Sequence, residues 1–277
     1  MTGSDNPAGR EQTDAENEPI EPVPMKLRVL LLVAAFLPPT APAGAIVGGA
    51  AAVNDGLGRS VVTIVGSRGN FCTGSLIAPA LVLTVAHCVQ PGADYKIVEY
   101  DAEKRPQLKD VKAVAIHPGF QMQAMLNHRA TADVALLRLE IPAKGKSPSM
   151  LGAPQMPLLP GAKFTVAGIG VTVRGDGKSG GAIRKADLVA TGKPGTLQIR
   201  LVDPATQGAR DGLSACTGDS GAPVFEEQPS GPVIVGVVSW STGANNAAGC
   251  GGLTGVTPLT LYRDWIVQTA RQWGFVL

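Results

Sequence analysis

The feature that most restricts the fold of this chain is a series of short apolar runs separated by turn residues. The runs are rich in Val, Ile, Leu and Thr and are bounded by Gly, Pro, Asn and Asp, a pattern typical of β-strands. We expect strands at residues 61–65, 72–77, 81–84, 96–99, 111–116, 134–139, 164–167, 197–201, 222–225 and 233–239. One long stretch, residues 259–272, has helical periodicity instead, with Leu261, Trp265, Ile266 and Thr269 on one face. Many strands and one terminal helix predict an all-β sandwich or barrel.

The N-terminal residues differ in composition from the rest of the chain. Residues 1–24 are polar, acidic and proline-containing, which predicts a disordered leader or a translation start assigned too far upstream. Residues 25–45 then show two basic residues, an uninterrupted apolar run and a small-residue end at Ala43-Gly44-Ala45, the layout of a secretory signal peptide. The run is too short to span a bilayer, which needs about 20 residues. The alternative is a buried helix or strand. We expect a secreted protein, extracellular or periplasmic, that starts at Ile46.

Charge and cysteine content narrow the functional classes. The formal net charge is only +2, and Lys and Arg are dispersed, which argues against nucleic-acid binding. Four cysteines suit an oxidising compartment, and they allow three pairings among which the spacing does not choose. No CxxC or HExxH spacing is present, so we expect neither a metal nor a cofactor.

Ser220 is the first candidate for chemistry. It lies in the segment Cys-Thr-Gly-Asp-Ser-Gly-Ala-Pro, residues 216–223. A serine hydroxyl becomes a nucleophile only when a base removes its proton. The flanking glycines allow a sharp turn that can aim backbone N–H groups at a developing oxyanion. An ordinary β-turn is the alternative.

The base must be one of three histidines. His87 follows an apolar strand and precedes a cysteine, whereas His117 and His128 lie in polar or proline-containing loops and are interpreted as surface histidines. Asp133 opens the apolar run 134–137, where a charge is costly unless it is hydrogen-bonded. Holding an imidazole would satisfy it.

These residues occur in the chain order His, Asp, Ser, which distinguishes chymotrypsin-like proteases from subtilisins and α/β-hydrolases. Five motifs are collinear: Ile46-Val47-Gly48-Gly49, TVAHC, DVALLRL, GDSG and Ser239-Trp240. Over residues 46–277 the chain therefore resembles the trypsin/chymotrypsin family of serine proteases.

The resemblance implies two six-stranded antiparallel β-barrels with a C-terminal α-helix. The Pro/Gly/Ser-rich stretch 147–161 would separate a first barrel at about 46–150 from a second at about 160–258, with the helix at about 259–273. It also implies a monomeric serine endopeptidase that acts on proteins or peptides without a cofactor, with a protein inhibitor as a further partner and no nucleic acid or membrane. The alternative is a catalytically silent secreted binding protein on the same scaffold.

The family roles carry over residue by residue. His87, Asp133 and Ser220 would form the catalytic triad, and the N–H groups of Gly218 and Ser220 the oxyanion hole. Ile46 and Asp219 would form the activation ion pair. The implied disulfides are Cys72–Cys88 and Cys216–Cys250.

The implied substrate-binding residues are Ser214, Ser239, Trp240, Ser241 and Gly255. Ser214 would form the pocket floor and Gly255 one wall. An uncharged floor predicts apolar P1 residues such as Leu, Met, Phe or Tyr, because a buried substrate cation would stay uncompensated. Ser241, where many members have Gly, would narrow the pocket, and Ile169 replaces a common Trp.

Overall fold

The computed structural model describes residues 46–277 except 49–50, 54–55, 102, 104 and 194. The expected leader at 1–24 and signal peptide at 25–45 lie outside the described residues. Within the described part no helix is long and apolar enough to span a membrane.

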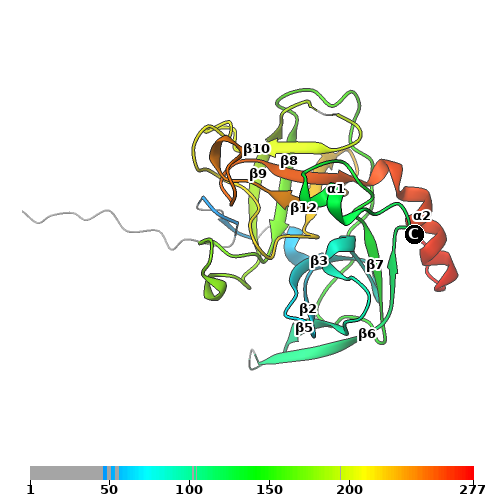
Figure 1. Ribbon diagram of the computed structural model, residues 1–277. Helices are drawn as coiled ribbons and strands as arrows, with labels where there is room; N and C mark the ends of the chain where they lie inside the picture. Colours follow the sequence, from blue (N-terminus) through cyan, green and yellow to red (C-terminus); the bar gives the residue numbers. More distant parts are fainter. Residues whose placement is uncertain (1–45, 49–50, 54–55, 102, 104, 194) are drawn as a thin grey trace, which may run out of the picture. The chain divides into compact units, whose positions relative to one another are not determined.

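The first half of the described chain forms a closed antiparallel barrel in the strand order β2-β3-β4-β7-β6-β5 (Figure 1). Its strands are β2 (Val61–Gly66), β3 (Phe71–Ala78), β4 (Leu81–Thr84), β5 (Tyr95–Tyr100), β6 (Pro106–Ile116) and β7 (Ala135–Leu139). β4 is buried along its whole length, which explains its continuous apolar sequence. Fully buried Ile64, Leu76, Leu83, Ile97 and Leu136 belong to its core.

The second half forms another ring of six strands in the order β9-β10-β13-β12-β11-β8, closed by pairing of β8 with β9. These strands are β8 (Lys163–Gly168), β9 (Arg184–Ala190), β10 (Ile199–Val202), β11 (Pro223–Gln228), β12 (Gly231–Ser241) and β13 (Thr254–Pro258). A short strand, β1 (Ala51–Ala52), pairs with β9. The two closed barrels confirm the expected fold class.

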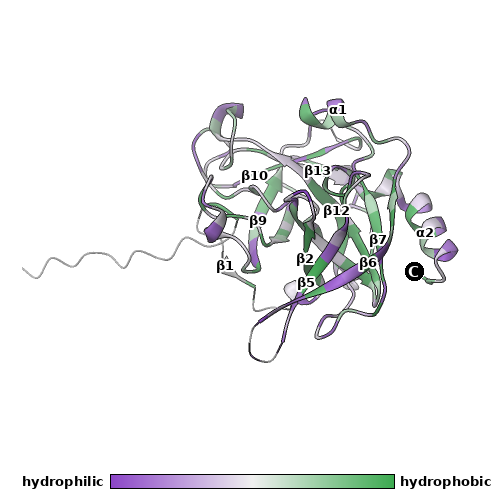
Figure 2. Ribbon diagram, turned by 60° about the horizontal axis from the view of Figure 1, so that its bottom comes forward, coloured by the Kyte–Doolittle hydropathy of each residue, from purple (hydrophilic) through white to green (hydrophobic). Residues whose placement is uncertain are grey.

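Helices are few. They are α1 (Met122–Leu126), α2 (Arg263–Gln272) and the 3-10 turns Leu57–Ser60, Ala86–Cys88, Gly177–Ser179, Ala244–Asn246 and Leu259–Leu261. Figure 2 shows mostly hydrophobic strands, whereas α2 carries both hydrophobic and hydrophilic residues. Ile266 and Thr269 of α2 are buried as expected, but Leu261 lies in the preceding 3-10 turn and is half exposed.

Three strands escaped the sequence analysis: the short β1, and the longer β9 and β13. In β9, buried Ala186, Leu188 and Ala190 alternate with more exposed residues, but two alanines give a weak hydrophobic signal. β13 contains Gly255 and Pro258, residue types that disfavour strands, yet it is buried between β10 and β12.

The N-terminal residues of the described chain belong to the second barrel, although the first was expected to begin at 46. Val47 forms a β-bridge with Ser214, and β1 pairs with β9. Ile46 is fully buried in the hydrophobic cluster of the second barrel. This apolar burial explains why the segment lies on that barrel.

Candidate active site

The turn that carries Ser220 lies where the two barrels meet. Thr73 of β3 donates its N–H to Ser220 O at 2.9 Å and its hydroxyl to Gly218 O at 2.7 Å. Gly221 has φ 83°, and a Cβ there would lie 2.1 Å from Thr73 O. Only glycine permits this approach, so the turn is held against the first barrel by its backbone.

Asp133 is a fully buried carboxylate surrounded by hydrogen-bond donors. Its Oδ1 accepts from His87 N at 3.0 Å, and its Oδ2 accepts from His87 Nδ1 at 2.8 Å and from Ser239 Oγ at 2.5 Å. These bonds offset the cost of burying the charge. A carboxylate only accepts, so His87 Nδ1 carries a proton and Nε2 of the neutral ring is left as an acceptor.

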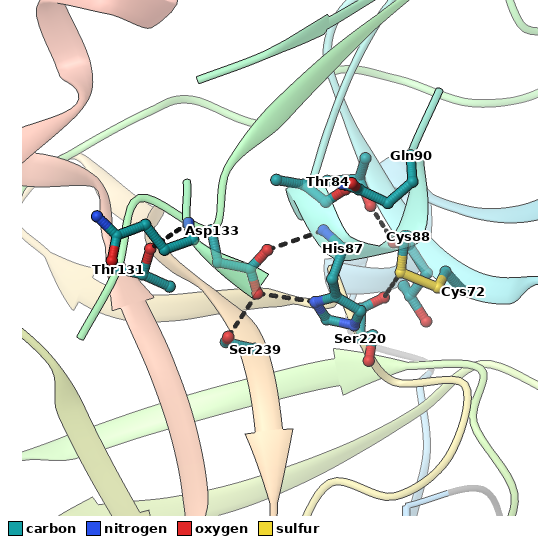
Figure 3. A network of polar contacts seen from close by, with 12 residues as sticks. Cys72, Thr84, His87, Cys88, Gln90, Thr131, Asp133, Ser220 and Ser239 are labelled. Atoms are coloured by element: carbon teal, nitrogen blue, oxygen red, sulfur yellow. Dashed lines mark hydrogen bonds and ion pairs between the residues drawn. A yellow bond between two sulfur atoms is a disulfide. The ribbon is translucent and has the colours of Figure 1, made fainter. Parts of the chain in front are cut away.

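His87 lies between Asp133 and Ser220 (Figure 3). His87 is on the 3-10 turn Ala86–Cys88, one residue after β4, and Asp133 lies two residues before the start of β7, the strand paired with β4. Ser220 comes from the turn before β11. Three segments far apart in sequence thus bring a base with a fixed tautomer beside a half-buried hydroxyl.

Two backbone N–H groups flank this hydroxyl. Among the described residues, neither the Gly218 nor the Ser220 N–H donates a hydrogen bond. Gly218 has φ 95°, and a Cβ there would lie 2.8 Å from the Phe71 ring. Glycine is therefore needed at this position, and both donors remain available to an anionic oxygen.

Asp219 is the second fully buried carboxylate of this region. Its oxygens accept from Gly170 N at 2.8 Å and Cys216 N at 2.9 Å. Burial raises the pKa of Asp219 to about 7, and the two backbone hydrogen bonds oppose this rise only in part. No ion pair to Asp219 is formed within the described ranges.

The residues around Asp219 leave room for its carboxylate. A Cβ on Gly168 or Gly170 would lie 2.0 Å or 2.5 Å from Asp219 side-chain atoms. Ile169, the residue that departs from the common Trp, is buried in the core cluster of the first barrel. Ile169 therefore makes an apolar contact there, and its neighbours Gly168 and Gly170 are the residues that border the Asp219 carboxylate.

A pocket of about 380 Å³ opens beside Ser220. It is lined by Phe71, Arg174, Cys216, Thr217, Gly218, Ser220, Val238, Trp240, Ser241, Gly249 and Cys250. The disulfides are Cys72–Cys88, next to His87, and Cys216–Cys250, on the pocket wall. These are the two pairs that the resemblance implied.

Of the five expected substrate-binding residues, Trp240 and Ser241 line this pocket, whereas Ser214, Ser239 and Gly255 do not. Ser214 is fully buried, where its hydroxyl donates to Ala215 O at 2.9 Å and accepts from Gly251 N at 2.6 Å. Gly255 pairs with Trp240 across β12 and β13, and a Cβ on it would lie 2.0 Å from the indole. The register of β13 therefore places the Gly255 backbone against the indole of Trp240.

The sequence analysis missed several residues of the pocket lining, among them Arg174, and it missed Thr254, which pairs with Ser241 behind that lining. Thr254 is fully buried, with its hydroxyl accepting from Ala215 N at 3.0 Å. Arg174 reaches the pocket from an exposed loop, and its Nη1 donates to Ala248 O at 2.7 Å. The glycine-rich sequence around Arg174 does not indicate this contact.

A comparison of the sequence with known protein families agrees with the fold described above. The family model for trypsin matches residues 46–266. The chain belongs to the trypsin family. Its two barrels and C-terminal helix fit the chymotrypsin-like fold of that family. No group of three or more His, Cys, Asp or Glu residues in the described part of the chain could hold a metal ion.

Three relatives illustrate the range of proteins to which the chain is similar. The chain is 30% identical over 184 residues to Glucanase inhibitor protein 4 of Phytophthora infestans, covering 61% of this chain and 69% of that protein. It is 29% identical over 229 residues to human Kallikrein-15, covering 74% and 84%. It is 28% identical over 225 residues to Coagulation factor XII of Cavia porcellus, covering 71% of this chain but only 36% of that protein.

Proposed function

We propose that this protein is a secreted serine endopeptidase that uses Ser220, His87 and Asp133. The observation that supports this most directly is the 2.8 Å hydrogen bond from His87 Nδ1 to buried Asp133, with the Ser220 turn on the other side of the ring (Figure 3). That bond leaves Nε2 as the nitrogen able to accept the serine proton.

The proposed reaction proceeds in two halves. Ser220 Oγ attacks the scissile carbonyl while its proton passes to His87 Nε2, and the N–H groups of Gly218 and Ser220 stabilise the resulting oxyanion. The C–N bond then breaks, and His87 donates the proton to the leaving amine. In the second half, His87 takes a proton from the water that attacks the acyl-enzyme, and it returns this proton to Ser220 Oγ as the ester C–O bond breaks and the acid leaves. Asp133 orients and stabilises the imidazolium throughout.

The proposed substrates have an apolar P1 residue. Among the described residues that line the pocket, Arg174 is the only charged one, and it is a cation. A Lys or Arg side chain there would meet like charge without a carboxylate to compensate it. Ser214 is fully buried and does not line the pocket, and the Ser241 side chain occupies space on the lining that glycine would leave open, which favours small apolar side chains over large ones.

Secretion and activation belong to the same proposal. Two disulfides support an oxidising destination, as the signal-peptide pattern does. Cleavage after Ala45 would create an α-ammonium group on Ile46, and the buried Asp219 carboxylate would be its counter-ion.

A silent binding protein on the same scaffold is the second candidate, favoured by the name of the Phytophthora relative, a glucanase inhibitor protein. The test is reaction of the secreted protein with a fluorophosphonate probe, together with a cleavage profile on a peptide library. Labelling that maps to Ser220 and is lost in Ser220→Ala supports the protease. An unlabelled, folded wild-type protein would establish the silent alternative.

A further inference from the structure

A pocket of about 450 Å³ opens on the second barrel and shares no lining residue with the pocket beside Ser220. Its volume is within the range of about 300–1,000 Å³ that is typical of ligand sites. β9 and β10 contribute apolar residues to its wall, and three carboxamide residues line it, Gln207, Asn245 and Asn246. None of the described residues on this lining is charged. We call it the carboxamide pocket.

The backbone at the three carboxamide residues is left-handed. The φ angles are 51° at Gln207, 52° at Asn245 and 61° at Asn246. A residue with a Cβ seldom adopts such angles, although asparagine tolerates them better than most. Glycine would adopt them without steric cost, as the neighbouring Gly208 does at φ 74°. The turns therefore do not require these side chains, which points to a role for the carboxamides in binding.

The carboxamides keep hydrogen-bonding capacity free for a ligand. Gln207 Nε2 donates to Pro204 O at 3.0 Å, and Asn245 Nδ2 donates to Ala209 O at 3.1 Å. Each carboxamide has two N–H donors and an acceptor oxygen. In both side chains the oxygen and one N–H have no partner in the described part of the chain, and the Asn246 side chain has none at all there. Free donors and acceptors therefore lie together on one uncharged rim.

The chemistry of the pocket matches a ligand with several hydroxyl groups. A hydroxyl both donates and accepts hydrogen bonds, so a carboxamide can bind it through its N–H or through its oxygen. A sugar offers several hydroxyls and an apolar C–H face, which match the carboxamide rim and the apolar wall. The described lining gives an ion no counter-charge. We propose that the carboxamide pocket binds an uncharged sugar.

Loop 243–249 connects the carboxamide pocket to the pocket beside Ser220. Near one pocket, Asn245 N–H donates to Gly208 O at 2.8 Å. At the other end of the loop, Gly249 lines the second pocket. A bound sugar therefore lies one short loop away from the Ser220 pocket. The ligand is either a free oligosaccharide or a glycan that a protein substrate carries.

The first experiment measures binding without catalysis. Fluorescently labelled Ser220→Ala is applied to an array of neutral oligosaccharides, and calorimetry then measures the Kd of each oligosaccharide that binds. The test variant adds Asn246→Gly, which removes one carboxamide and suits the left-handed backbone. We expect Ser220→Ala to bind at least one neutral oligosaccharide. Asn246→Gly should raise its Kd about tenfold, because two hydrogen bonds are lost.

The matched control is Gln272→Ala in the same background. Gln272 is an exposed carboxamide residue at the end of α2, outside the carboxamide pocket. Its loss should leave the Kd unchanged, whereas a second pocket variant, Gln207→Gly, should weaken binding of the same oligosaccharide. Failure of Ser220→Ala to bind any neutral oligosaccharide, or equal affinity with and without Asn246→Gly, overturns the proposal.

A kinetic comparison identifies the source of the sugar, and only this step rests on the proposed protease function. The peptides differ only in a neutral glycan, placed at successive positions outside P1. A glycan carried by the substrate should lower KM about tenfold in the wild type, and Asn246→Gly should remove that gain. Equal KM values with and without the glycan, while oligosaccharide binding is retained, assign the site to a free sugar. Wild type that cleaves no peptide would contradict the protease, but the binding result would still stand.

Discussion

Ser239 Oγ donates a 2.5 Å hydrogen bond to Asp133 Oδ2, the same oxygen that accepts from His87 Nδ1. Ser239 lies on β12 of the second barrel, whereas Asp133 lies two residues before the start of β7 of the first. The position of the carboxylate therefore depends on the contact between the barrels as well as on its own loop.

Ser239→Ala should lower both activity and stability. It removes one donor from a buried carboxylate, and a lost hydrogen bond to a charged group costs about 1.5–3 kcal/mol. We expect the free energy of unfolding to fall by that amount in chemical denaturation, with a decrease in kcat. Ser230→Ala, on an exposed turn, is the control. Equal stability of the two variants would mean that Ser239 does not support Asp133.

Ser220→Ala and His87→Ala should each reduce kcat by about 10⁶-fold, as in other serine protease triads. The reason is that nucleophile and base act as one unit. Asp133→Asn should cost about 10⁴-fold, the loss already known for this change in a trypsin-like enzyme. Steady-state kinetics on the best library peptide measures all three. Near wild-type turnover in Ser220→Ala would remove the triad assignment.

Substrates with Ala, Val or Leu at P1 should be cleaved faster than those with Lys or Arg. The pocket holds a cation and no carboxylate, so a basic P1 residue is unfavourable. Ser241→Gly should then shift the preference towards Phe and Tyr by widening the pocket. Relative kcat/KM values for a P1 series measure this. Efficient cleavage after Arg by the wild type is the contrary result.

The secreted, active protein should begin at Ile46. The small-residue site at Ala43-Gly44-Ala45 directly precedes it, so one cleavage would complete export and free the α-amino group. N-terminal sequencing of the secreted enzyme, with the uncleaved cytoplasmic chain as an inactive control, decides this. An active enzyme that begins upstream of Ile46 contradicts it.

Cleavage before Ile46 should change how stability depends on pH. In the uncleaved chain the pKa of Asp219 is raised to about 7, above its ordinary 3.8, so the folded state binds the proton more tightly. The free energy of unfolding should fall as the pH rises from about 4 towards 7.

In the cleaved chain the new ammonium group pairs with Asp219, which raises the pKa of the amine. The stabilisation is then complete below the unfolded amine pKa of about 7.7–8.0 and is lost as the pH rises through the folded value. Denaturation of both forms between pH 4 and 10 measures the difference. Asp219→Asn should remove it, and a persisting difference in that variant would show another cause.

Local sequence was sufficient to identify the strands of the first barrel and the segments that carry His87, Asp133 and Ser220. The alternation of residues in a strand and the glycines that flank a turn involve only neighbouring residues. Both patterns can therefore be recognised in the sequence alone. The terminal helix was recognised for the same reason, although its first turn is 3-10 and Leu261 is exposed.

Tertiary structure alone decided how distant segments meet. The pairing of β13 with β12 put Thr254, rather than Gly255, beside Ser241, and a loop of the first barrel brought His128 onto Trp240. Ile46 entered the second barrel although the first follows it in sequence. The strand register and the contacts between the barrels depend on the burial of residues that are far apart in the chain. A local sequence pattern therefore cannot predict them.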